Sequence, residues 1–70
     1  LPFDDRLKGR EIEILKLIDQ GHSNKEIARA LSISVDTVKW YLKSIFSKLC
    51  VARRGQAIAE ARRLRLLDKA

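Results

Sequence analysis

The sequence predicts a small all-α domain built from four helices, and three observations lead to this prediction. Apolar residues recur three and four positions apart in four separate stretches, which is the spacing of an amphipathic helix. No stretch alternates β-branched and polar residues, as a half-buried strand would. Serine residues, which cap helix N-termini well, stand directly before two of the four stretches.

Residues 1–6 are expected to be the end of a linker, because the proline and the two aspartates there do not favour regular structure. The domain is then expected to cover residues 7–70. Its first helix is predicted over residues 9–20, with Gly21 as a left-handed C-cap. The start of this helix is weak, because the N-cap position holds Lys8, which has no hydrogen-bond acceptor.

The two middle helices begin at clearer signals. Ser23 and Glu26 have the spacing of a capping box, in which each side chain accepts from the other residue's backbone N–H. They are expected to start a short helix over residues 24–31. Ser34 is expected to cap a longer helix over residues 35–49, which contains no glycine or proline.

A fourth helix is predicted over residues 54–67, after a bend. Arg53 stands before it and gives it a poor N-cap.

Cys50 is the single cysteine, so the chain forms no internal disulfide and no cysteine-based metal cluster. We expect its side chain to be a small buried hydrophobe rather than a reactive thiol.

The two middle helices have the spacing of a helix-turn-helix, in which two helices meet at a steep angle across a short turn. Ala28 is small enough to let the helices cross closely, Val38 fills the space from the second helix, and Ile33 closes the corner. Ser32 stands where many such motifs have glycine. The corner must therefore avoid a strongly positive φ or accept some strain.

In a helix-turn-helix that binds DNA, the second helix enters the major groove and meets base edges. Lys39 and Lys43 are predicted to lie on the outer side of this helix and can donate to the acceptors of guanine. Trp40, between them, can pack on a thymine methyl group or on sugar. Asp36 can accept from a cytosine amino group, although its charge also suits a helix N-terminus without any DNA contact.

Other polar side chains are expected to contact the DNA phosphates. Most of them stand at or near helix N-termini, where free backbone N–H groups favour anions. The candidates are Asn24, Lys25, Ser34, Thr37, Lys48 and Arg53.

The charge distribution supports a polyanionic partner. The net charge is +6, yet residues 1–33 carry six basic and six acidic side chains, whereas residues 34–70 carry nine basic and three acidic ones. A one-sided basic field suits nucleic acid or an anionic membrane surface.

No apolar run approaches the roughly 20 residues of a membrane span and no signal peptide opens the chain, so we expect a cytoplasmic protein without a membrane partner.

A family resemblance runs along nearly the whole chain. It rests on the following motifs: Leu7-x-x-Arg10-Glu11, Leu15, Gly21, Ser23-Asn24-Lys25-Glu26-Ile27-Ala28, Leu31-x-Ile33-Ser34, Thr37-Val38-Lys39, Lys48-Leu49-x-Val51 and Arg54-x-x-Ala57. In these positions the chain resembles the LuxR-type (GerE- or FixJ-like) DNA-binding domain of bacterial transcription regulators. It lacks methionine and is expected to be the C-terminal piece of a longer regulator. The Trp40-Tyr41-Leu42-Lys43 run and the arginine-rich last helix most resemble regulators with a large ATP-binding sensor upstream.

The resemblance implies that the third helix reads double-stranded DNA and that the last helix joins two copies in a homodimer. The implied dimer contacts are Ala59, Arg62, Arg63 and Leu66. RNA polymerase is a further candidate partner. Tyr41 stands where the family commonly has histidine, and its hydroxyl can still reach a phosphate. Glu11 and Arg54 have no obvious DNA role, and we expect them to tie the first helix to the last.

Two alternatives stay open. Region four of an RNA polymerase sigma factor has a similar helix-turn-helix, although the fourth helix argues against it. A helical protein-interaction module would instead use Trp40 as an anchor in a partner's groove. An enzyme is not expected, because the sequence shows no catalytic triad, no carboxylate pair and no glycine-rich phosphate loop. No cofactor is expected either.

Overall fold

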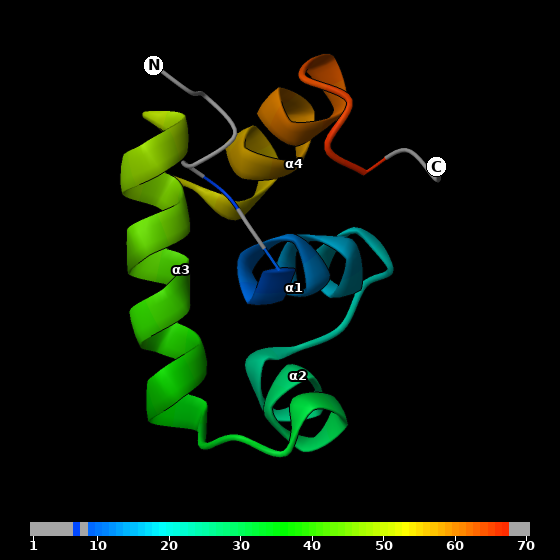
Figure 1. The fold of residues 1–70 in the computed structure, drawn as a ribbon, viewed down its shortest axis with the longest axis vertical. Helices are drawn as coiled ribbons and strands as arrows, with labels where there is room; N and C mark the ends of the chain where they lie inside the picture. The colour runs from blue at the N-terminus through cyan, green and yellow to red at the C-terminus, as the bar shows by residue number, and fades with distance from the viewer. Residues whose placement is uncertain (1–6, 8, 68–70) are drawn as a thin grey trace.

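The computed structural model describes residue 7 and residues 9–67. Its four helices are α1 (Gly9–Asp19), α2 (Asn24–Leu31), α3 (Val35–Leu49) and α4 (Arg54–Arg63) (Figure 1). The described residues form no strand, so the predicted all-α fold is confirmed. The predicted linker and Lys8 lie outside the described residues.

The longest helix, α3, runs along one side of the molecule (Figure 1). The short helix α2 lies beside its beginning and α4 lies beside its end. The first helix, α1, lies between them and contacts each of the other three helices. The other three helices therefore pack around one side of α3, and none of them covers its opposite side.

The buried apolar side chains come from all four helices and from Leu7, which precedes α1. They are Leu7, Ile14, Leu15, Ile18, Ile27, Ala28, Val38, Leu42, Ile45, Leu49, Ala57 and Ala61. The small side chain of Ala28 is buried where α2 meets α3, as the close crossing of a helix-turn-helix requires. Burial of this continuous apolar surface is the main favourable contribution to folding.

All four helices end in the same way, with a residue in the left-handed conformation after the last turn. Glycine supplies this conformation only after α1, where Gly21 has φ of 91°. After α2, α3 and α4 it is adopted by Ser32, Cys50 and Arg65, at 57°, 58° and 61°. Each of these three residues therefore carries the steric cost that a glycine would avoid.

Two of these turns answer questions that the sequence left open. The corner of the helix-turn-helix accepts strain at Ser32, and the Ile33 N–H donates to the Ala28 carbonyl at 3.0 Å. The expectation that Cys50 is buried was wrong, because its side chain is exposed. Cys50 is the C-cap of α3, and its backbone has the left-handed conformation. The turn that follows is closed by a hydrogen bond from the Val51 N–H to the Phe46 carbonyl.

The last helix is shorter than the predicted range of residues 54–67. It ends at Arg63, and the Leu66 N–H donates to the Ala61 carbonyl at 2.8 Å. The turn brings Leu66 and Leu67 back against the core, where both are half-buried. A continued helix would carry Leu66 outward, so burial of apolar surface favours the turn.

Candidate nucleic-acid interface

The start of α3 is capped as its sequence predicted. The Ser34 hydroxyl accepts from the Thr37 N–H at 3.0 Å, and the two hydroxyl oxygens lie 2.8 Å apart. Both side chains are at the first turn, where backbone N–H groups lack partners within the helix. This end of α3 therefore presents hydroxyls and free N–H groups together, which is the chemistry that binds a phosphate.

The start of α2 carries the predicted capping box. Glu26 accepts from the Ser23 N–H at 2.8 Å, and the Ser23 hydroxyl accepts from the Glu26 N–H at 3.2 Å. The hydrogen bond from the Ser23 backbone is the main cause that lowers the pKa of Glu26. Lys25 is exposed beside this cap. The cap thus fixes the helix end from which Lys25 projects.

Asn24 has a structural contact in addition to its predicted role at a phosphate. Its side-chain oxygen accepts from the Arg54 guanidinium at 2.8 Å. Arg54 therefore links the start of α4 to the start of α2, and not to α1 as expected. Only the backbone N–H and the side-chain amide nitrogen of Asn24 are left for a phosphate.

The outer face of α3, defined here by Asp36, Lys39, Trp40 and Lys43, is exposed along its length. Neither lysine forms an ion pair or a hydrogen bond with another described residue. Trp40 has 64% of its surface exposed. Its ring meets that of half-buried Tyr41 edge-on, with 5.2 Å between ring centres. The four predicted base-contact residues are thus brought together and are accessible.

Lys48 is engaged inside the domain. Its ammonium group lies 3.0 Å from both carboxylate oxygens of Glu11, which also accepts from the Ser44 hydroxyl at 3.0 Å. The Glu11 side chain is only 10% exposed, so its charge requires this partner. These bonds hold α1 against α3, whereas the tie expected for Glu11 was to the last helix.

This cluster is a feature that sequence reasoning missed. A signal was present, since Glu11 falls on the inner, buried side of the first helix. A buried carboxylate is expected to pair with a cation, but the sequence does not indicate which of the many basic side chains is the partner.

Arg53 is exposed at the N-cap of α4. The weak N-cap predicted there is compensated by Gln56, a residue of α4 itself. Its side-chain oxygen accepts from the N–H groups of Ala52 and Arg53 at 3.0 and 3.1 Å. Gln56 therefore holds the backbone bend, and Arg53 is left to project from the start of α4.

The outer side of α4 carries the predicted dimer contacts. Ala59 is exposed, whereas the guanidinium groups of Arg62 and Arg63 bind Asp19 and Glu60. Leu66 was expected on this surface, but it follows the end of the helix and packs against the core. The basic charge here is balanced by acidic side chains of the domain.

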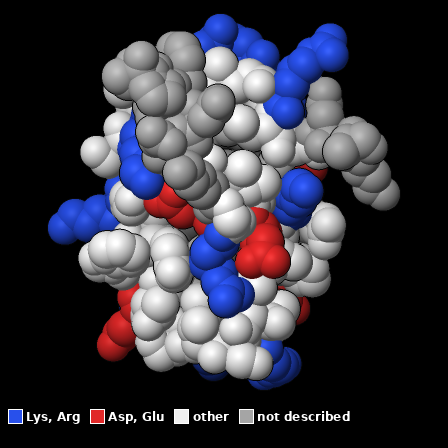
Figure 2. Space-filling model, viewed as in Figure 1, with Lys and Arg blue, Asp and Glu red and all other residues white. Residues whose placement is uncertain are grey.

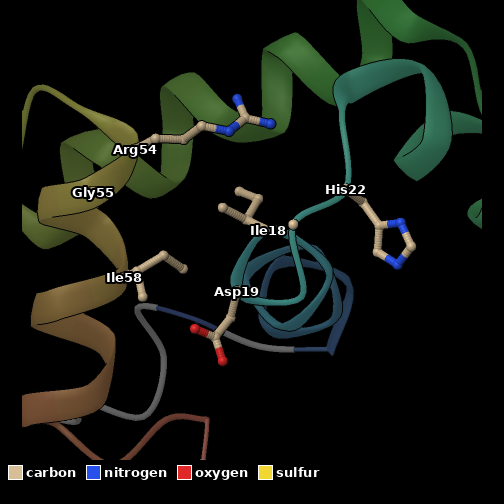
Figure 3. Close-up of a pocket in the computed structure, with 7 residues that line it drawn as sticks. Ile18, Asp19, His22, Arg54, Gly55 and Ile58 are labelled. Atoms are coloured by element: carbon tan, nitrogen blue, oxygen red, sulfur yellow. The ribbon is translucent and has the colours of Figure 1, made fainter.

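A shallow hollow separates the end of α1 from the start of α4 (Figure 3). Ile18 and Ile58 supply the apolar part of its lining, and Asp19, His22 and Arg54 stand around it. Arg54 binds Asn24, Asp19 binds Arg62, and His22 lies 3.6 Å from Glu26. The Arg54 and Asp19 pairs join helices to one another, His22 lies in the loop before α2, and the three side chains do not converge on the hollow.

Acidic and basic side chains are interspersed on the face drawn in Figure 2. Acidic side chains lie near its middle and at its lower edges, and basic side chains lie between them and project around the rim. No group of three or more potential metal ligands lies together in the described residues. No helix in this part of the chain is long and apolar enough to cross a bilayer.

The sequence matches the family model of bacterial regulatory proteins, luxR family, over residues 5–61. The chain belongs to this family. It is a helix-turn-helix DNA-binding domain of the type found in transcriptional regulators and response regulators. The predicted family and fold are confirmed, and the match favours this family over the sigma-factor alternative.

Members of the family include transcriptional regulators of different size. The chain is 53% identical, over 76% of its length, to the HTH-type transcriptional regulator AlkS of Alcanivorax borkumensis, and covers 6% of that protein. It is 46% identical, over 97% of its length, to the transcriptional regulatory protein LiaR of Bacillus subtilis, and covers 32% of it. The chain thus spans less than a third of the length of either relative.

Two solved structures show the same fold. The response regulator ChrA of a heme-sensing two-component system matches with a TM-score of 0.84 and 52% identity, over 86% of this chain and 30% of that one. The transcription factor GerE matches with a TM-score of 0.82 and 42% identity, over 86% of this chain and 90% of that one.

Proposed function

We propose that this luxR-family domain binds specific sequences of double-stranded DNA by placing α3 in the major groove. The observation that carries the proposal is the contrast between the two sides of α3. Its inner side is buried in the core, whereas its outer face presents two lysines without partners among the described residues and an exposed indole. Lysine donors and an apolar ring are groups that distinguish base edges in the major groove.

Each residue of the outer face has a role in this proposal. Lys39 and Lys43 donate to guanine O6 and N7, and Trp40 contacts the apolar part of the groove. Asp36 is nearest the start of the helix. Its carboxylate accepts from a cytosine amino group, or its negative charge only interacts favourably with the helix dipole.

The phosphate contacts are proposed to come from the helix ends around α3. Lys25 and Arg53 are exposed and can reach phosphates as cations. Ser34, Thr37 and Tyr41 contribute hydroxyls, and Asn24 contributes through its amide nitrogen and its place at the start of α2. Lys48 is the weakest candidate, because binding a phosphate would take it from the buried carboxylate of Glu11.

We further propose that two copies bind together on DNA through the outer side of α4, around Ala59, Arg62 and Arg63. Half-sites would then lie about one helical turn of DNA apart. As part of a bacterial transcription regulator acting in the cytoplasm, the domain would bring such a protein to its operator, and RNA polymerase would be a further partner there.

The experiment that tests the main proposal is selection of binding sites from random duplex DNA, followed by titration at several salt concentrations. We expect a defined sequence motif, repeated at the half-site spacing. The logarithm of the affinity should fall with the logarithm of salt concentration, with a slope of about −0.9 for each phosphate contacted. Binding without sequence preference and without salt dependence would contradict the proposal and favour a protein partner for Trp40.

A further inference from the structure

Trp40 is the one large hydrophobic side chain that the described residues expose. At about 100° per residue, it lies almost directly opposite the middle of the buried stripe formed by Val38, Leu42, Ile45 and Leu49. A helix that keeps this stripe in the core therefore points Trp40 straight away from the domain. In a major groove that position faces the base edges and not the sugar-phosphate walls.

The ring of Trp40 is supported from one side. Tyr41 meets it edge-on at an angle of 76°, and the Tyr41 side chain is itself half-buried. This contact limits the orientations that the indole adopts before it binds anything. A large apolar surface held in place gains affinity when it is covered, because little side-chain freedom is lost on binding.

The major groove offers few apolar groups to such a ring. Its base edges present hydrogen-bond donors and acceptors, and the one apolar group among the four bases is the C5-methyl group of thymine. An indole has a single N–H donor and a wide apolar face. A base pair with a C5-methyl group therefore gives that face the largest apolar contact in exchange for contact with water.

We propose that Trp40 is a specificity-determining residue that recognises the C5-methyl group of a pyrimidine, which is a thymine in unmodified DNA. This inference rests on the proposed function, because it requires α3 to lie in the major groove. It adds the chemical group that Trp40 recognises. It also implies that methylation of cytosine at the same position changes binding.

The test uses duplexes that carry the sequence selected by this chain. Each thymine is replaced in turn by uracil, which removes the methyl group and leaves every hydrogen-bonding atom of the base in place. At one thymine in each half-site, we expect the affinity to fall by about fourfold, the factor that corresponds to burial of one methyl group. At the other thymines the replacement should have little effect.

A second series replaces that thymine and its adenine by a cytosine–guanine pair, with or without a methyl group on C5 of the cytosine. We expect 5-methylcytosine to bind about fourfold more tightly than cytosine. Equal affinity for the two pairs would overturn the inference.

Trp40→Ala supplies the decisive comparison. The exposed side chain contributes no core contact, so the variant should keep the helical circular dichroism spectrum of the parent chain. We expect it to bind thymine and uracil duplexes equally, whereas Trp40→Phe keeps part of the discrimination. Ser47→Ala, an exposed position further along α3, is the matched control and should keep all of it.

The outcomes separate this inference from the proposed function. If Trp40→Ala binds more weakly but wild type does not distinguish uracil from thymine, the ring packs on sugar and the inference is wrong while DNA binding stands. If discrimination persists in Trp40→Ala, another residue recognises the methyl group. If the chain selects no sequence at all, the proposed function fails first.

Discussion

The outer sides of α3 and α4 both carry two basic side chains, yet the two surfaces differ in what those charges contact. On α4, Arg62 binds Asp19 of α1 and Arg63 binds Glu60 of its own helix. On α3, Lys39 and Lys43 bind no other described residue. The same formal charge is therefore available to a polyanion on α3 and is largely balanced within the domain on α4.

Lys48 extends the comparison to a single helix. It lies on α3, nine residues after Lys39 and five after Lys43, but its ammonium group is held by Glu11. A count of basic residues along α3 would rate all three lysines alike. The contacts show that position around the helix, rather than the number of charges, decides which lysines can reach DNA.

The strongest disruption should come from the inner side of α3. Replacing Leu42 by Ala removes a buried side chain and leaves a cavity, and we expect the free energy of unfolding to fall by about 2–5 kcal/mol. Denaturant unfolding followed by circular dichroism measures this change. Ser47→Ala, on the exposed side, should be close to neutral, and equal stability of the two variants would show that α3 is rotated differently.

The affinity of one domain for a single half-site should depend on the outer face of α3 and not on the outer side of α4. We expect Lys43→Ala to weaken binding to the selected sequence by about 1–3 kcal/mol, because it removes a base contact. Arg63→Ala is the matched control, since its charge is already paired with Glu60. Fluorescence titration of a single half-site compares them, and an equal loss for both variants would remove the distinction between the two helices.

Lys48→Ala should affect stability more than the salt dependence of binding. The change removes the ammonium group that lies against both carboxylate oxygens of buried Glu11, so we expect about 1–2 kcal/mol of destabilisation. The slope of affinity against salt should stay as in the parent chain, whereas Arg53→Ala should reduce its size by about 0.9. A reduced slope for Lys48→Ala would instead place that side chain at a phosphate.

The turn between α3 and α4 should give the smallest effect. Cys50 has φ of 58° and an exposed side chain, and we expect Cys50→Gly to stabilise the domain by about 0.5–1 kcal/mol by relieving the left-handed strain. Gly21→Ala is the control of opposite sign, because alanine is strained at φ of 91° even though nothing lies near its added carbon. Thermal unfolding measures both, and a destabilised Cys50→Gly would mean that the thiol makes a contact worth more than the strain.

Local signals were sufficient for much of the fold. The bounds of α2 and α3 agree with the predicted ranges, because Ser23 and Ser34 cap these helices through bonds that span only three residues. The four predicted base-contact residues are exposed together for a similar reason, since helical periodicity alone sets which side of α3 they share. The pair of Arg63 with Glu60 was also accessible to sequence reasoning, because residues three apart are neighbours on a helix.

Contacts between distant residues could not be read in this way. Arg54 and Asn24 are 30 positions apart, Lys48 and Glu11 are 37 apart, and Arg62 and Asp19 are 43 apart. Each pair depends on how the helices pack, and several basic residues competed for each acid. The end of α4 was misplaced for the same reason, because the return of Leu66 to the core depends on apolar surface that other helices provide.

The amino-acid sequence was thus enough to establish the helices, their inner stripes, the helix-turn-helix and the family, because period, caps and motifs act over a few residues. The tertiary structure decided which charged side chains pair with one another. It brings Lys48 to Glu11 and Arg62 to Asp19. Lys39, Lys43 and the indole of Trp40 remain exposed on the outer face of α3. Electrostatic pairing depends on distance in space, and only the packing of α1 against α3 and α4 brings those acids within reach.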